Sequence, residues 1–198
     1  MKTTPFAMQG RFSVRLEQDD NARSPQEDGD HGLFLVAKHR QFFVAPPESE
    51  KNFEIQEVLD AHKKTHHVFP LEAYIHSGVA LALSGEGNFP DRQWDVSQLG
   101  LVFVSKAEWP APAAARKAAL GYVATWNQYL SGDVYGYVVA EHETAGDPQS
   151  AIIDDHVESC WGYYGEEHAK AEGKQALEGV ATKADEIPTL KALELVKA

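Results

Sequence analysis

Short apolar stretches recur along the chain between segments that are rich in glycine, proline and charged residues. Their length and composition predict β-strands at residues 11–17, 33–37, 71–83, 99–105, 134–141 and 151–165. Residues 71–83 contain Gly78, so they predict either a pair of strands or one long bent strand. Residues 151–165 follow a turn-like segment and are expected to return antiparallel to residues 134–141.

Other segments have the composition of helices. Residues 52–64 carry apolar side chains at helical spacing, and the alanine-rich residues 110–130 predict a second helix. From Glu166 the composition changes to Ala, Glu and Lys, which predicts a helix to about residue 181 and a last short helix after Pro188.

The order of these elements indicates the fold class. Strands follow one another in neighbouring pairs and do not alternate regularly with helices, which favours an α+β fold with a mostly antiparallel sheet and flanking helices. We expect one such domain over residues 1–168 and a helical C-terminal extension over residues 169–198.

Composition narrows the classes of protein and partner. Of the 198 residues, 43% are hydrophobic, which is enough for a packed core, and the formal net charge of −12 opposes direct binding to nucleic acid or to an anionic membrane. The one cysteine, Cys160, cannot form an intramolecular disulfide, and the sequence shows no signal peptide or membrane-spanning stretch. We therefore expect a cytoplasmic protein. We expect no cofactor, and whether the chain forms a homo-oligomer stays open.

The negative charge is concentrated in one segment. Residues 118–169 contain no Lys or Arg and nine acidic residues, which are Asp133, Glu141, Glu143, Asp147, Asp154, Asp155, Glu158, Glu166 and Glu167. Like charges in contact repel by roughly 1 kcal/mol per pair in water. A cluster of this kind would therefore be relieved by a cationic partner.

Three interpretations of this segment are open: a solvated acidic face, a docking surface for a basic protein, or a carboxylate cage for a divalent metal. Asp154 and Asp155 lack the ligand pattern of a calcium loop, which disfavours the metal. Aromatic residues in the same segment are candidate anchors for a partner. The expected docking surface comprises Asp133, Tyr135, Tyr137, Glu141, Glu143, Asp154, Asp155, Glu158, Trp161, Glu166 and Glu167.

The sequence also offers candidate catalytic residues. His76 precedes Ser77 and Gly78 and could act as a general base, with Asp95 or Asp30 fixing its tautomer. Cys160 is a candidate nucleophile, but the negative charge of the nearby Glu158 disfavours its thiolate form.

A histidine cluster, HKKTHH, lies at the end of a predicted helix. His62 and His66 are four residues apart, as two metal ligands on one helix face would be, but no Glu follows His62 as an H-E-x-x-H motif requires. Surface histidines near a helix C-terminus, His67 included, are the simpler interpretation.

Four blocks in this order, FPLEAYIHSGVAL, QWDVSQLGLVFVSK, WNQYLSGDVYGYVV and ESCWGYYG, resemble a family of small proteins from bacteriophages, prophages and plasmids. The resemblance covers about residues 17–168. Ile75 stands where the family has Asp before the histidine, which weakens a His–Asp pair there. The resemblance implies an accessory protein of a mobile element that acts in the cytoplasm of a bacterial host, and it implies no particular reaction.

We therefore expect a phage or mobile-element accessory protein that binds and inhibits a basic host protein, such as a nucleic-acid-handling defence complex, through an acidic aromatic surface. The alternative hypothesis is a small cytosolic enzyme in which His76 is the general base, assisted by Asp95 or Asp30. A structural or assembly protein is a third possibility.

Overall fold

The computed structural model describes residues 4–27, 29, 32–47, 52–89 and 96–196, with side chains described as far as residue 184. Contacts divide the chain into two compact units: unit 1 is Met1–Ala22 with Gly132–Ala198, and unit 2 is Arg23–Ser131. The chain passes between the two units twice, and units connected in this way can still fold together. The expected single domain over residues 1–168 with an extension over residues 169–198 therefore stays a prediction.

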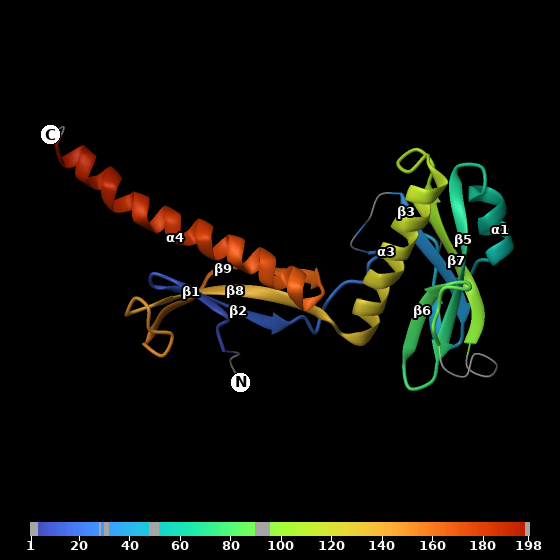
Figure 1. Cartoon of the computed structure of the whole chain (residues 1–198), viewed down its shortest axis with the longest axis horizontal. Coiled ribbons are helices and arrows are strands. Elements are labelled where there is room, and N and C mark those ends of the chain that lie inside the picture. Colours follow the sequence, from blue (N-terminus) through green and yellow to red (C-terminus); the bar gives the residue numbers. More distant parts are fainter. Residues whose placement is uncertain (1–3, 28, 30–31, 48–51, 90–95, 197–198) are drawn as a thin grey trace. The chain divides into compact units, whose positions relative to one another are not determined.

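Unit 2 is built on a five-stranded antiparallel sheet in the order β4-β3-β7-β5-β6. Its strands are β3 (Leu33–His39), β4 (Phe42–Val44), β5 (His66–Ile75), β6 (Val79–Leu83) and β7 (Val96–Ser105). Two helices accompany the sheet, α1 (Ile55–His62) and α3 (Pro112–Ser131). Figure 1 shows α1 and α3 on opposite faces of this sheet.

The apolar run in β3 is continuous because both faces of this strand are covered. Leu35 belongs to the hydrophobic cluster that contains Trp126 of α3, whereas Phe34 packs in a second cluster with Val58 of α1. The neighbouring strand β7 approaches β3 so closely that a Cβ atom on Gly100 would lie 1.9 Å from the carbonyl oxygen of Val36. Glycine at position 100 is therefore a packing requirement of the sheet.

Unit 1 contains a four-stranded antiparallel sheet in the order β1-β2-β8-β9, covered by one helix. Its elements are β1 (Ala7–Gln9), β2 (Phe12–Gln18), β8 (Val134–His142), β9 (Ile152–Tyr164) and α4 (Glu166–Val196). β2 and β8 are neighbours although more than a hundred residues separate them in the sequence. Figure 1 shows α4 running along one face of this sheet.

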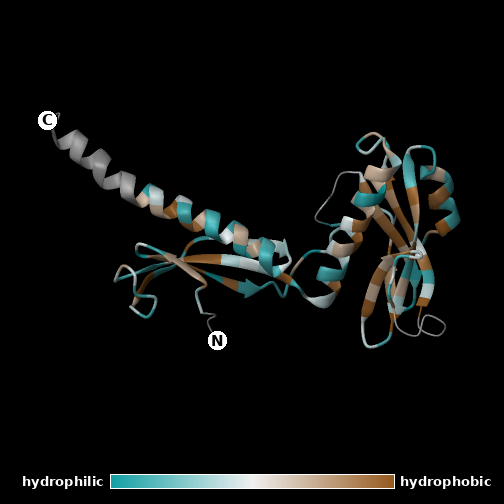
Figure 2. Ribbon diagram, in the orientation of Figure 1, coloured by the Kyte–Doolittle hydropathy of each residue, from teal (hydrophilic) through white to brown (hydrophobic). Residues whose placement is uncertain are grey.

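The first half of α4 holds the core of unit 1. Leu177 and Val180 pack against Val14 of β2 and against Tyr137 and Val139 of β8. These strand residues alternate with side chains that point to the opposite face, as the period of a strand requires. Figure 2 shows more hydrophobic colouring on the strands of this sheet than on α4. The buried apolar residues of α4, which are Ala169, Leu177, Val180 and Ala181, are spaced as on one helix face.

The predicted α+β class with antiparallel sheets and a C-terminal helix is confirmed. Residues 71–83 form the strand pair, not the bent strand, and β5 begins earlier, at His66. Proline is unusual inside a strand, so Pro70 hid the earlier start of β5 from the sequence-based prediction. Pro70 lies beyond Leu71, the last residue of β5 that pairs with β6, so the lack of an N–H group on Pro70 does not break the hydrogen bonds between these two strands. The predicted break near Pro188 is wrong, because α4 continues as one helix from Glu166 to Val196.

Candidate functional site

The nine acidic residues of the base-free segment all lie in unit 1. The predicted antiparallel return is confirmed: β8 and β9 pair with Tyr137 opposite Cys160 and Val139 opposite Glu158. Gly165, with a φ of 87°, then turns the chain from β9 into α4. These carboxylates therefore lie immediately before β8, in the hairpin and its loop, and in the first turn of α4.

Basic residues from outside the segment neutralise part of this charge. Arg11 pairs with Glu141, and Arg15 Nη1 lies 3.0 Å from Asp155 Oδ1. The expected surface is therefore less negative at these two positions than the sequence indicates.

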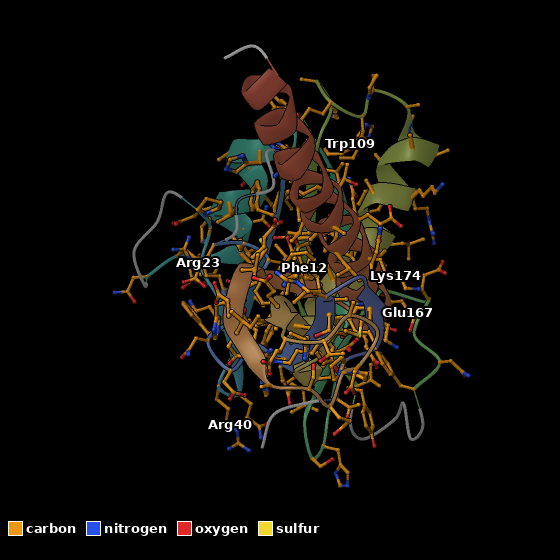
Figure 3. All side chains as sticks on the ribbon, turned by 90° about the vertical axis from the view of Figure 1, so that its left-hand side faces the viewer. Phe12, Arg23, Arg40, Trp109, Glu167 and Lys174 are labelled. Atoms are coloured by element: carbon orange, nitrogen blue, oxygen red, sulfur yellow. The ribbon has the colours of Figure 1, made fainter. Side chains whose placement is uncertain are left out.

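A third cation acts at the start of α4. Lys170 Nζ lies 2.7 Å from Glu166 Oε1 and 3.1 Å from Glu167 Oε1. These pairs span one helical turn and lie near the surface, where Figure 3 labels Glu167, so each contributes little to stability.

The other five carboxylates of the segment have no ion pair among the residues that the structure describes; they are Asp133, Glu143, Asp147, Asp154 and Glu158. Asp147 and Asp154 each accept a backbone N–H two residues ahead, at 2.9 Å, which orders the loop without reducing its charge. Glu158 accepts a hydrogen bond from the Tyr137 hydroxyl at 3.3 Å. These five residues are the source of the uncompensated negative field.

The aromatic residues of the segment divide between the core and the surface. Tyr137 is buried and stacks on Tyr163 with ring centroids 5.8 Å apart, so its ring belongs to the interior and not to the expected surface. Burial raises the pKa of the Tyr137 hydroxyl, and the Glu158 charge raises that pKa further. Tyr135 is half-buried, and its pKa is also raised, first by burial and then by the charge of Asp133.

Strand β9 also exposes apolar side chains. Trp161 is 44% exposed, and its indole lies directly over Gly136. Together with Ile152 at 41% and Ile153 at 59%, it places three of the five large exposed hydrophobic residues of the described chain on β9. An exposed edge strand with this composition is typical of an interaction surface.

A small pocket of about 270 Å³ opens between the hairpin and α4. Its lining includes Tyr137 and Glu158 from the hairpin and Glu172, Gln175 and Lys183 from α4. Two carboxylates and one lysine line this pocket, so its wall is polar and of mixed charge.

The alternative catalytic residues do not form a described site. His76 is exposed on the β5–β6 turn of unit 2, whereas Cys160 is exposed on β9 of unit 1. Asp95 and Asp30 lie outside the described residues. The hypothesis of His76 as a general base therefore stays a prediction.

The histidine cluster is part of a packed surface. The rings of His62 and His66 lie 5.2 Å apart, and both contact the edge of Phe34. His67 Nε2 lies 3.0 Å from the Trp109 carbonyl oxygen. Within the described residues, no group of three or more His, Cys, Asp or Glu side chains is arranged to hold a metal ion.

Three functional candidates escaped the sequence-based reasoning: Ser13, Arg15 and His142 are buried polar residues on one face of β2 and β8. Their signal is the alternation of polar and apolar residues in FSVRLE, which predicts a strand but does not say that the polar positions are buried. The pairing of β2 with the distant β8 could not be read from either segment.

Searches with family models, among curated proteins and among solved structures return no match for this chain. Within the described residues, no helix has the length and apolar character needed to cross a membrane.

Proposed function

We propose that this chain is an accessory protein of a phage or other mobile element that binds a basic host protein through the outer surface of the β8–β9 hairpin. A nucleic-acid-handling defence complex is the target class that fits, because its cationic surface complements a negative one. Binding there would occlude the surface that holds the nucleic acid, so the result is inhibition.

One observation carries the proposal: β9 combines uncompensated carboxylates with exposed apolar side chains. Asp154 and Glu158 lie on the same edge strand as the exposed Ile153 and Trp161. Glu158 faces α4 and Trp161 lies on the other face, over Gly136, so a partner would meet both along the free edge of β9. A solvated acidic face that served only solubility would not need large apolar residues in contact with water. Interfaces, in contrast, pair aromatic anchors with charged surroundings that steer the partner.

The test uses the tagged full-length chain as bait in bacterial lysate. We expect a basic, nucleic-acid-binding protein to be retained at about 50 mM salt and released at about 500 mM, because screening weakens exposed charge pairs. Glu158→Lys and Asp154→Lys should each slow association with the recovered protein by roughly 3- to 10-fold.

Glu178→Lys is the matched control, because it makes the same change of charge at an exposed position of α4 outside the base-free segment. This variant should associate at nearly the wild-type rate. Retention that does not depend on salt, or equal effects of Glu158→Lys and Glu178→Lys, would contradict the proposal.

A further inference from the structure

Three polar side chains of β2 and β8 are buried side by side in unit 1. Ser13, Arg15 and His142 have exposed fractions of only 2%, 5% and 2%. Ser13 pairs with Ala140 across the β2–β8 ladder, so Ser13 and Arg15 lie on the same sheet face as Ala140 and His142. Burying such groups costs free energy unless they bond to one another, which requires a specific arrangement.

Ser13 and His142 are joined by a short hydrogen bond. Ser13 Oγ lies 2.7 Å from His142 Nε2, and His142 Nδ1 lies 3.4 Å from the carbonyl oxygen of Ser150. A carbonyl oxygen only accepts, so the proton of the neutral ring is on Nδ1. Nε2 then accepts the hydroxyl proton of Ser13. This is the arrangement of a nucleophile, its base and a group that orients the base.

The pair is reached through a cavity and is not sealed in the core. Ser13, Arg15 and His142 line a space of about 250 Å³. The rest of its wall is formed by Thr4, Pro5, Ala140, Pro148, Gln149 and Ile152. Most of these are small or apolar, so the space suits a short aliphatic group attached to a polar reacting centre.

Arg15 supplies N–H donors at the same cavity. Its Nε lies 2.8 Å from Glu17 Oε1 and its Nη1 lies 3.0 Å from Asp155 Oδ1, so two carboxylates hold the guanidinium in place. A guanidinium has five N–H donors, and its Nη2 takes part in neither of these two bonds. The two carboxylates offset the charge of Arg15, so what it offers to the negative charge that develops during acyl transfer is a set of N–H donors held in a fixed position.

We propose that Ser13 is a nucleophile, activated by His142, that accepts short acyl groups from carboxylic esters. Ser13 Oγ bonds to the acyl carbon as its proton moves to His142 Nε2, and Arg15 stabilises the oxyanion. The ester C–O bond then breaks, and the alcohol leaves with the proton from His142. Water attacks the acyl-serine in the second half, which releases the carboxylic acid and restores Ser13. This activity is independent of the proposed function.

The test is labelling of the full chain with a small alkyl fluorophosphonate, followed by intact mass and peptide mapping. Ser13 Oγ displaces fluoride from phosphorus while His142 takes the proton, so we expect one adduct per chain at Ser13 with release of one fluoride. Ser13→Ala should abolish the adduct, and His142→Gln should slow its formation by roughly 100-fold or more. Wild-type protein unfolded in urea should not react.

Cys160→Ser is the control for the exposed thiol, and it should label like the wild type. Circular dichroism shows whether Ser13→Ala and His142→Gln stay folded. If either variant unfolds, the peptide map of the labelled wild-type protein decides by itself whether Ser13 reacts. An unlabelled Ser13 in the folded wild type, or labelling at the wild-type rate in folded His142→Gln, would overturn the proposal. Folded Ser13→Ala should keep salt-sensitive partner binding, so the two proposals can fail separately.

Discussion

The indole of Trp161 covers Gly136 across the β8–β9 ladder, where a Cβ atom at position 136 would lie 2.3 Å from Trp161 Cε3. An aromatic ring laid over a strand glycine restores the packing that the missing side chain would have supplied. The exposed tryptophan of the proposed docking surface is thus held in place by the absence of a side chain on the neighbouring strand.

Gly136→Ala should therefore displace the indole and weaken the hairpin. We expect a loss of about 1–2 kcal/mol in the free energy of unfolding, because a second close contact, 2.9 Å to the Cys160 carbonyl oxygen, involves backbone. Trp161→Phe is made both in the wild type and in Gly136→Ala, and subtracting each spectrum from that of its parent gives the fluorescence of Trp161 alone. A change in this difference spectrum reports the new environment of the ring. Gly179→Ala in α4, where a Cβ atom meets nothing within 4 Å, should leave this signal unchanged.

Gly100→Ala tests the close approach of β3 and β7. The added methyl group would collide with the Val36 carbonyl oxygen, so the central strands of unit 2 must separate, at a cost of about 3 kcal/mol. Urea unfolding followed by circular dichroism measures this loss. Gly121→Ala is the matched change in α3, where the space is open, and it should stabilise by about 0.5–1 kcal/mol. Equal free energies of unfolding for the two variants would show that β3 and β7 do not lie this close together at Gly100.

Acid should weaken unit 2 through His66. Burial lowers the pKa of His66, and the charges of His62 and Lys106 lower it further, so the folded state favours the neutral ring. The stability that depends on this ring is complete above the unfolded pKa of about 6.5 and declines as the pH falls toward the lower folded value. Urea midpoints at pH 7.5, 6.5 and 5.5 should show the decline.

His66→Phe should reduce this pH dependence, because a phenyl ring keeps the contact with Phe34 but does not titrate. His76→Gln, a change at an exposed turn, should keep the wild-type slope. A slope that survives in His66→Phe would assign the effect to another group.

Removal of Arg11 should strengthen the field of the hairpin. Arg11→Gln leaves Glu141 without its cation, so association with the basic partner should accelerate by roughly 2- to 5-fold at low salt. Stability should change by less than about 1 kcal/mol, because the pair lies near the surface. Lys64→Gln removes the same charge from unit 2 and should not accelerate binding; biolayer interferometry would compare the two rates. An unchanged rate for Arg11→Gln would argue against steering by this face.

Local pattern was sufficient for the strands that pair with their neighbours in sequence. The β8–β9 hairpin is an example, because a turn segment separates two strand-like runs. Long-range register was not accessible: nothing in the sequence indicates that Ser13 lies beside Ala140 and within reach of His142. For the same reason the partners of Glu141 and Asp155 could not be foreseen, since Arg11 and Arg15 precede them by more than a hundred residues.

The insertion of unit 2 between β2 and β8 has a consequence for synthesis on the ribosome. β2 emerges early but must wait for residues 23–131 to be translated before its partner strand exists. Unit 2 has all of its own strands by then, so it can fold first, while the N-terminal segment has only the short β1–β2 pair and lacks β8 and β9. The Ser13–His142 bond, and any chemistry that depends on it, can form only near the end of translation.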